Sequence, residues 1–371
     1  PFLLGNYRIE NILPGGSEDM IDVSGAPNKK LRWEKTHSVN AGFDFAVLNQ
    51  AINLSVDYYY RKGVDLIGTQ MLPLETGFEM LTVNWASMRN QGVEVALSTR
   101  NVHTKNFMWT TNFNFAYNNN KVLKEALRED ALEPGREGYP AGALFALKTA
   151  GLDEEGYPMF QDKDGKAVSA MEFFKLQEWG FGATDLTARE RRELYTYVGT
   201  ADCPYTGGFN NTFTYKAFEL GVNFSFDFGG KVRSQPTYSI VDFDKGRNTN
   251  RDILNRWTPE NTETIFPVLL SQNERLDEYM WYSNQNEIYR NLDIWIRDLN
   301  YVRLQNIRLG YTLPTNFSRT LGMTSATVAI EGRNLLVFGS SYKNYLDPET
   351  MSNAYATPAP KSVTLSLNLI F

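Results

Sequence analysis

The sequence has very little of the chemistry that most enzymes and metalloproteins use. It contains a single cysteine, Cys203, and only two histidines, His37 and His103, in 371 residues. One cysteine excludes an internal disulfide framework and a cysteine-based zinc cluster. Two distant histidines do not assemble with a nucleophile and an orienting carboxylate. We therefore predict that the chain is not an enzyme and holds no metal or cofactor.

The sequence also lacks a long apolar run and an excess of positive charge. No run of about 18 apolar residues occurs, so no membrane-spanning helix is expected. The formal net charge is −6, which leaves no basic stripe to bind the phosphates of a nucleic acid. Aromatic residues are abundant, at 13% of the chain with 20 Tyr and 23 Phe. That abundance favours a β-rich protein with aromatic residues at membrane interfaces.

The last ten residues show a pattern that is expected to recur throughout the chain. Side chains along a strand point alternately to its two faces. Residues 362–371 put Ser, Thr and Asn on one face and an apolar row on the other, namely Val363, Leu365, Leu367, Leu369 and Phe371. A strand of a soluble sandwich can alternate in the same way. An aromatic carboxy terminus on the apolar face, however, is typical of an outer-membrane barrel.

The same alternation predicts about nine antiparallel strands. They are expected near residues 39–47, 52–60, 93–99, 107–117, 207–215, 220–228, 299–313, 324–337 and 362–371, with a bulge near Gln305. Residues 1–35 are expected to be loop, and short helices are expected over Lys121–Asp130 and Leu186–Tyr195. We predict one all-β domain over residues 1–371, an antiparallel transmembrane β-barrel wall.

Long and short connections alternate between these strands. The long ones are expected over residues 63–89, 118–206, 229–298 and 339–360, and short turns join the other strand pairs. Outer-membrane barrels put tight turns on the periplasmic side and long loops outside the cell. Nine strands leave two unpaired edges, which a bilayer does not tolerate, so further strands are expected elsewhere.

Several segments resemble sequence elements of one family of membrane proteins. Asn90–Glu94 has the form N-x-G-V-E, and Tyr301–Pro314 reads Y-V-R-L-Q-N-I-R-L-G-Y-T-L-P. Glu331–Phe338 contains G-R-N-L-L-V-F, Tyr345–Glu349 reads Y-L-D-P-E with a shorter spacing than the family has, and Arg256–Asn261 reads R-W-T-P-E-N. In type and order these segments resemble SusC-like (RagA-type) TonB-dependent outer-membrane transporters.

The resemblance implies a barrel of about 22 strands, of which this chain is the carboxy-terminal part. A plug domain and a TonB box are expected outside this chain, and its start at Pro1 agrees with a longer precursor. Expected partners are a SusD-like lipoprotein lid, TonB through the missing amino-terminal region, and outer-membrane lipid. Transporter–lipoprotein pairs are expected to dimerise, in a Bacteroidetes-type outer membrane. The expected function is TonB-dependent import of oligosaccharides or oligopeptides.

Aromatic residues in the long loops are candidates for substrate contact, because they suit sugar faces and peptide side chains. The candidates are Trp85, Trp281, Tyr282 and Tyr289. The alternative is that these side chains pack the loops against each other or against the lipoprotein. The acidic residues Glu274, Asp277, Glu278 and Glu287 could bind cationic groups, with a solvated surface as the simpler interpretation.

Two short acidic segments could suggest a calcium site. Asp153–Gly156 and Asp162–Gly165 are rich in carboxylates, but neither has the complete spacing of an EF-hand loop. A turn or hairpin supported by glycine is the better prediction for both.

Two other functions fit parts of the sequence. An outer-membrane adhesin would use the same barrel to hold glycans without transport. A soluble carbohydrate-binding β-protein would be extractable without detergent, which the apolar rows argue against.

Overall fold

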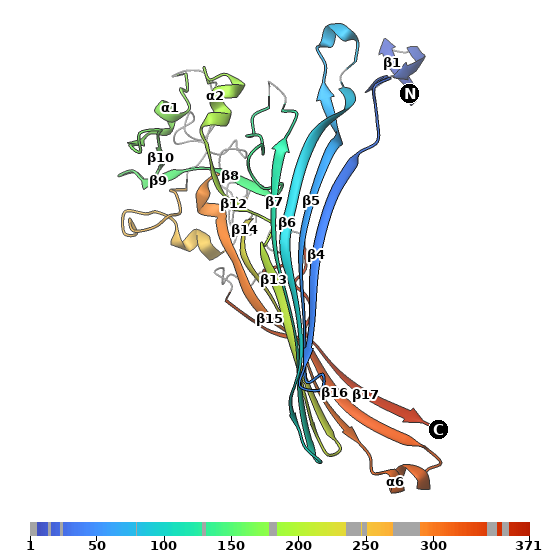
Figure 1. Cartoon of the computed structure of the whole chain (residues 1–371). Helices are drawn as coiled ribbons and strands as arrows, with labels where there is room; N and C mark the ends of the chain where they lie inside the picture. Colours follow the sequence, from blue (N-terminus) through green and yellow to red (C-terminus); the bar gives the residue numbers. More distant parts are fainter. Residues whose placement is uncertain are drawn as a thin grey trace.

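Nine long antiparallel strands form one curved sheet in which neighbours follow the order of the chain (Figure 1). The computed structural model describes residues 6–13, 16–22, 25–78, 80–127, 131–177, 184–234, 246, 251–269, 290–339, 347–350 and 356–371. The strands are β4 (Lys35–Val47), β5 (Ile52–Met71), β6 (Met80–His103), β7 (Phe107–Lys124), β13 (Tyr205–Tyr215), β14 (Phe218–Arg233), β15 (Ile296–Thr312), β16 (Ser325–Phe338) and β17 (Ser362–Ile370). The prediction of about nine strands is confirmed.

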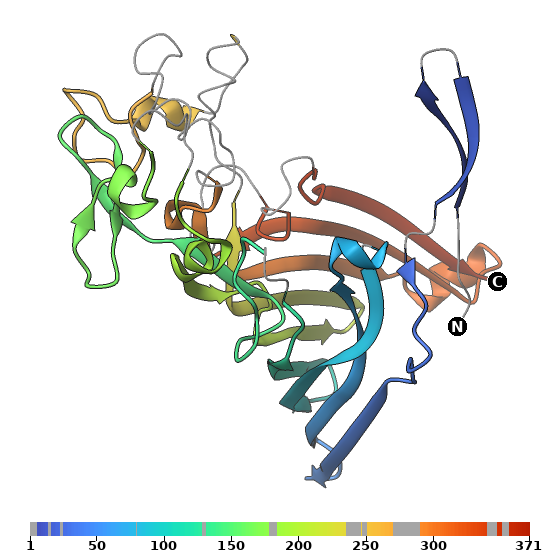
Figure 2. The ribbon, with the colours of Figure 1, turned by 90° about the horizontal axis from the view of Figure 1, so that it is seen from above.

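The sheet is a section of a barrel wall rather than a closed barrel. Viewed from above it follows an arc, with β4 at one edge and β17 at the other (Figure 2). A two-residue strand, β3 (Gly25–Ala26), adds a parallel pairing to β6. No helix in the described segments is long and apolar enough to cross a bilayer.

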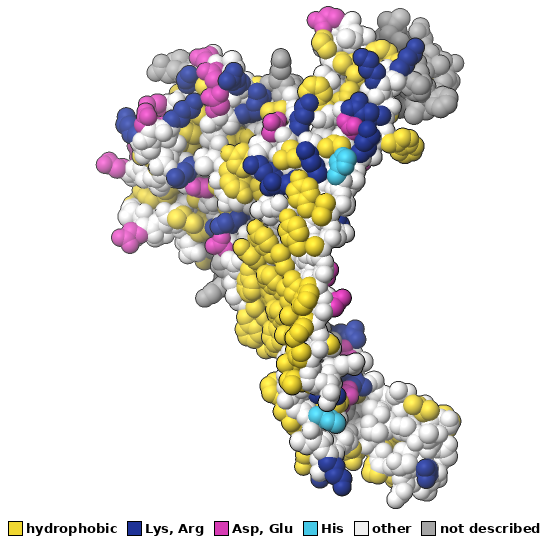
Figure 3. All heavy atoms as spheres, in the orientation of Figure 1, with side chains coloured by type: hydrophobic (Ala, Val, Ile, Leu, Met, Phe, Trp, Pro, Cys, Tyr) yellow, Lys and Arg dark blue, Asp and Glu magenta, His cyan; other side chains and the backbone are white. Residues whose placement is uncertain are grey.

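One face of the sheet, here called the apolar face, carries a continuous hydrophobic row. In the strand register each member pairs directly with the next, from Phe45 through Leu54, Leu97, Phe113, Phe209, Phe224 and Leu304 to Leu336. Phe45 is 46% exposed and Leu336 is 50% exposed. Figure 3 shows the resulting hydrophobic band along the sheet. A contiguous apolar surface of this extent indicates contact with something other than water.

Aromatic pairs mark both ends of the band. Trp109 and Phe213 stack with their ring centroids 5.5 Å apart near the short turns. Tyr117 and Tyr205 stack at 5.1 Å near the other end. Strand β13 runs between these levels and has 11 residues, which is the length that a tilted strand needs to cross a bilayer. The longer strands β5 and β6 therefore continue beyond the band.

Short turns gather at one end of the sheet. Leu48, Asn49 and Gln50 adopt positive φ angles in the turn between β4 and β5. Lys216 and Ala217 alone join β13 to β14, and the short helix α6 (Thr315–Thr320) joins β15 to β16. The predicted bulge at Gln305 is confirmed, because the pairing of β15 with β16 shifts between Leu304 and Asn306.

The expected long loop over residues 63–89 is instead mostly strand. Strand β5 continues to Met71 and β6 begins at Met80, and a single 3-10 turn, η1 (Leu74–Thr76), lies in the connection. The pairing of β5 with β6 shifts between Gly63 and Ile67. Such bulges interrupt the period-two alternation. The strands predicted from that alternation were therefore shorter than β5 and β6 are.

Two further expectations differ from the structure, and one is confirmed. Residues 1–35 contain a separate two-stranded hairpin of β1 (Asn6–Leu13) and β2 (Gly16–Asp22) instead of loop alone. The expected helix over Lys121–Asp130 is wrong up to Lys124, because β7 continues to that residue, and 128–130 lie outside the described residues. The helix expected over Leu186–Tyr195 is present as α2 (Ala188–Glu193).

The connection between β7 and β13 folds as a module with its own core. It contains β8 (Ala143–Leu147), β9 (Thr149–Leu152), β10 (Pro158–Gln161), β11 (Ala167–Val168), α1 (Ala170–Phe173), α2 and β12 (Tyr195–Thr200). The core also takes Leu292 and Trp295 from the connection that precedes β15, where η3 (Asp293–Trp295) lies. Phe160 and Trp295 are completely buried. Two insertions far apart in the sequence thus share one hydrophobic core.

Two adjacent substitutions test the assignment of the faces. Leu97→Arg puts a charge on the apolar face, and we expect it to lower the free energy of unfolding by roughly 2–4 kcal/mol near the bilayer midplane. Ser98→Arg, one residue away on the opposite face, should cost about 1 kcal/mol or less. Urea unfolding of the full-length protein in phospholipid vesicles, followed by tryptophan fluorescence, measures both. Equal costs would contradict the assignment.

Candidate functional site

The opposite face, here called the polar face, carries a row of hydrogen-bonding side chains across all nine long strands. Each member pairs directly with the next in the strand register. From β4 to β17 the row is Ala46, Asn53, Ser98, Asn112, Asn210, Asn223, Asn306, Arg333 and Ser362. Only Ala46 lacks a polar side chain. From β4 to β14 the polar row and the hydrophobic row occupy adjacent positions of the same strands, and their side chains point to opposite faces. On β15 and β16 the register shift between Leu304 and Asn306 separates the two rows by one or two further residues.

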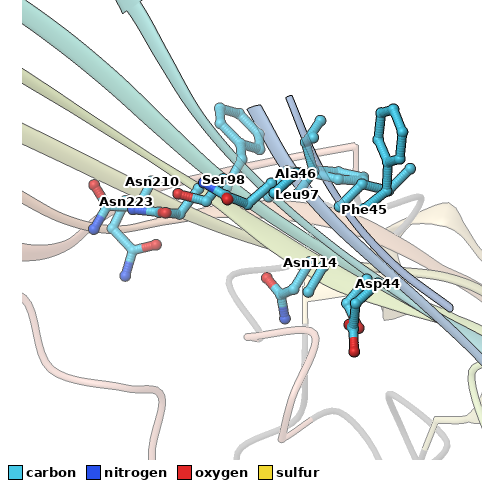
Figure 4. Close-up of a pocket in the computed structure, with 15 residues that line it drawn as sticks. Asp44, Phe45, Ala46, Leu97, Ser98, Asn114, Asn210 and Asn223 are labelled. Atoms are coloured by element: carbon cyan, nitrogen blue, oxygen red, sulfur yellow. The ribbon is translucent and has the colours of Figure 1, made fainter. Parts of the chain in front are cut away.

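A hollow of about 680 Å³ lies on the polar face over six strands, β4 to β7, β13 and β14. In Figure 4, Asp44 and Asn114 point to this side of the sheet, and Phe45 points to the other. The polar lining is Asp44, Asn53, Ser55, Ser98, Asn112, Asn114, Asn210 and Asn223. Amide and hydroxyl groups can donate and accept hydrogen bonds. The hollow is therefore suited to bind amide or hydroxyl groups.

A glycine of the N-x-G-V-E segment makes room for a hydrogen bond across the polar face. The Tyr59 hydroxyl donates to Asn118 Oδ1 at 2.9 Å, from β5 to β7 across β6. A Cβ atom on Gly92 of β6 would lie 2.6 Å from that hydroxyl oxygen and 2.1 Å from the Tyr117 carbonyl oxygen. Such approaches are too close, so only glycine fits this position. Asp57 pairs with Glu94 two positions along the strands from the Ser55–Ala96 pair, so both carboxylates lie on the polar face.

A buried charged cluster attaches the connection after β16 to the polar face. The Arg303 side chain on β15 is 2% exposed and pairs with Asp347, which is 6% exposed. Arg303 Nε also donates to Glu349 Oε1 at 2.9 Å. The Tyr301 hydroxyl donates to Asp227 Oδ2 of β14 and lies 3.3 Å from Glu349 Oε1. The Y-V-R-L and D-P-E segments, 44 positions apart at Arg303 and Asp347, therefore meet in one site.

The Asp347 carboxylate accepts two backbone hydrogen bonds from its own connection. Its Oδ1 accepts the Glu349 backbone N–H at 3.0 Å, and its Oδ2 accepts the Ala359 N–H at 3.3 Å. Burial alone would raise the pKa of Asp347, but the hydrogen bonds from Arg303 and these N–H groups outweigh it and leave the pKa lowered. The stabilisation is thus present above the ordinary pKa of aspartate. It is lost as the pH falls through the lowered pKa.

Of the four residues predicted to contact substrate, the structure describes only Trp85. Trp85 is exposed, and the Lys124 ammonium lies 4.2 Å from its ring centroid. Trp281, Tyr282 and Tyr289 lie outside the described residues, as do the acidic candidates Glu274, Asp277, Glu278 and Glu287. Substrate contact by these residues stays a prediction.

The two acidic segments are glycine-supported turns, as predicted. Asp153 Oδ1 accepts the N–H groups of Glu155 and Tyr157, and Gly156 follows with a φ of 87°. Asp162 repeats the arrangement with Asp164 and Lys166, and Gly165 has a φ of 81°. Each aspartate thus stabilises its own turn. Across the described ranges no group of three or more metal-ligating side chains is close enough to hold an ion.

The R-W-T-P-E-N segment shapes the connection between β14 and β15. Thr258 and Asn261 form an isolated β-bridge, and Asn261 Nδ2 donates to the Arg256 carbonyl at 3.0 Å. The Trp257 ring lies directly over Gly156, where a Cβ atom would approach it to 2.5 Å. Trp257 is therefore a packing residue that joins two separate connections.

Sequence reasoning missed the Arg303 cluster and the core of the module. Both unite residues that are far apart in the chain, and alternation within single strands carries no information about such contacts. The one available signal was the arginine itself, since a charged residue in a strand that spans a bilayer must face away from lipid and usually pairs with another group.

Comparison with known proteins gives this geometry a family context. Residues 13–144 match a family model described as TonB dependent receptor-like, beta-barrel. TonB-dependent receptor P3 of Formosa agariphila is 27% identical over 372 residues, covering 93% of this chain and 35% of the relative. SusC of Bacteroides thetaiotaomicron is 26% identical over 365 residues, covering 92% and 32%. The chain spans about a third of the length of these curated relatives.

Solved structures agree on the fold. The RagAB peptide transporter matches with a TM-score of 0.72 and 23% sequence identity, covering 99% of this chain and 38% of that chain. The same importer in its open-open state matches with a TM-score of 0.73. The nine strands therefore have the arrangement found in part of that barrel. The chain is a homologue of the SusC-like TonB-dependent receptors and carries part of their outer-membrane β-barrel.

Proposed function

We propose that this chain forms part of the wall of a TonB-dependent importer for oligosaccharides or oligopeptides. The observation that carries the proposal is the polar row across nine strands, which lies back to back with the hydrophobic row. A wall that is apolar on one face and polar on the other separates lipid from water. It fits a wide, hydrated passage better than a small barrel filled with side chains.

The chemistry of the hollow supports a large, uncharged or weakly charged cargo. Its polar lining is asparagine and serine with one aspartate, Asp44. Peptide groups and sugar hydroxyls can both form hydrogen bonds with such a surface. Many weak contacts also suit transport, because a cargo that binds at several shallow sites can leave each of them again.

The buried cluster at Arg303 supports a passage with a fixed inner contour. Residues 347–350 and Ala359 are attached to the polar face by the bonds of Asp347. A connection attached on the polar face narrows the passage from within. The cluster thereby sets which cargo fits.

Similarity to the RagAB peptide transporter supports a proposal about partners. We propose that this chain works with a SusD-like lipoprotein as a lid. The folded module between β7 and β13 offers a stable surface for such a lid. TonB would act through the amino-terminal plug region of the complete transporter, and two transporter–lipoprotein pairs would dimerise. The long connections would face the cell exterior.

Matched triple variants test transport through the polar face. Asn112→Leu, Asn210→Leu and Asn223→Leu together remove three hydrogen-bonding groups, and we expect uptake of labelled cargo by whole cells to fall roughly tenfold or more. The control changes Phe113, Phe209 and Phe224 to Leu, one residue away on the opposite face, and should keep uptake. Cargo is first identified by mass spectrometry of the detergent-extracted assembly. Co-purification of neither a lipoprotein nor a plug-bearing region would favour the adhesin function instead.

A second pair of variants tests the cluster. Arg303→Met leaves two carboxylates near the wall without their partner, and we expect it to lower the free energy of unfolding by about 3 kcal/mol. Arg308→Met on the same strand breaks an exposed pair with Glu219, 3.0 Å apart, and should cost about 1 kcal/mol or less. Adding Asp347→Leu to Arg303→Met should restore part of the loss. Urea unfolding in vesicles measures all three, and equal costs for the two arginines would contradict the role of burial.

A further inference from the structure

Four basic residues on four adjacent strands form a row on the apolar face. His37 of β4 pairs with Lys62 of β5, Lys62 pairs with Arg89 of β6, and Arg89 pairs with Lys121 of β7. Arg89 lies an even number of residues from Leu97, in a stretch whose register is unbroken, so it shares the face of Leu97. Direct cross-strand partners share a face. All four side chains, here called the basic row, therefore lie on the apolar face.

The basic row has no counter-charge in the part of the chain that the structure describes. Neither Lys62, Arg89 nor Lys121 forms an ion pair with a described carboxylate. The Nε atom of Arg89 is buried and has no hydrogen-bond partner. Like charges directly opposite each other on neighbouring strands destabilise a sheet. The described residues therefore provide no negative charge to neutralise the basic row.

The height of the basic row matches the level of lipid head groups. Tyr60 lies two residues from Lys62 toward the hydrophobic band, which is about 7 Å along a strand, and Tyr58 follows two residues later. Tyrosines of this kind mark the membrane interface. Further along β6 and β7, beyond the basic row as seen from the hydrophobic band, exposed Trp85 and Lys124 form a cation–π pair. Figure 3 shows Lys and Arg side chains gathered directly above the hydrophobic band.

We propose that the basic row binds the phosphate groups of an anionic lipid in the outer leaflet of the outer membrane. Guanidinium and ammonium groups are the usual ligands of phosphate. Four strands spaced by about 4.8 Å spread the row over roughly 14 Å, which suits a head group with two separated phosphates better than a single free phosphate. The inference rests on the proposed orientation, with long connections outside, but not on which cargo is transported.

Binding of such a lipid explains the like charges in register. Its phosphates would neutralise Lys62, Arg89 and Lys121 at once. The Trp85 ring beside Lys124 is then an interfacial anchor, the common position of tryptophan in membrane barrels. The lipid would hold strands β4 to β7 at a fixed depth in the membrane.

The test uses the full-length transporter in detergent, titrated with diphosphoryl lipid A and observed by native mass spectrometry. The variant Lys62→Gln, Arg89→Gln and Lys121→Gln should bind this lipid about a hundredfold more weakly, since each basic group near a membrane surface contributes about 1 kcal/mol. The control Arg61→Gln, Lys148→Gln and Lys166→Gln changes the net charge equally but lies elsewhere, and should bind like the wild type. Lipid A stripped of its phosphates should bind the wild type as weakly as the triple variant binds the intact lipid.

Thermal unfolding of the same samples is an independent test, because the variant and the wild type should change order in unfolding temperature when lipid is added. Without anionic lipid, the triple variant should unfold at a higher temperature than the wild type, because repulsion is removed. With diphosphoryl lipid A, only the wild type should gain stability. Equal binding by both triple variants, equal binding of the dephosphorylated lipid, or equal stabilisation by inorganic phosphate alone would each overturn the proposal. Transport can fail in every variant without affecting this result.

Discussion

The structure depends on one constraint, the need of every backbone N–H and C=O group in a bilayer for a hydrogen-bond partner. A bilayer offers none, so the strands must satisfy each other. The antiparallel ladder from β4 to β17 does so in unbroken chain order. Because side chains along each strand alternate, the same ladder fixes two surfaces at once, with Leu97 in the hydrophobic row and Ser98 in the polar row. Face and register are thus consequences of one bonding pattern. The open edges at β4 and β17 carry the same requirement, which further strands of a barrel would meet.

Charged residues follow a second rule, set by where they lie relative to the band. Within its height, ionised groups occur on the polar face, where Arg303 is enclosed by two carboxylates and a tyrosine. Replacing such a buried pair by apolar groups can be neutral for stability, so its value lies in specifying one arrangement of the connection after β16. Beyond the band the rule reverses, and the basic row lies on the apolar face without described partners. The two clusters differ because one is neutralised from within the chain and the other is not.

The alternation of apolar and polar residues predicted most of the sheet, because the sequence of each strand by itself shows which of its two faces is apolar. Residues 220–228 and 362–371 specify both faces unaided, and the irregular parity around Gln305 located a bulge correctly. The prediction failed where this alternation is interrupted. Bulges near Gly63 and Trp85 concealed the upper halves of β5 and β6. It also failed where partners are distant, since the core around Phe160 and Trp295 joins segments more than a hundred residues apart.

The polar row shows why the family's motifs and the passage chemistry are separate matters. Gly92, Arg303 and Asp347 belong to the segments that resemble the family, and each has a structural role: room for Tyr59, a buried pair, a fixed turn. The asparagines of the hollow lie outside those segments. They present amide groups to the hollow, and Asn53 also donates to the Gln50 carbonyl in the turn before β5. In the proposed importer, the motif residues would set the local shape of the wall, and the asparagines of the hollow would set its contacts with cargo.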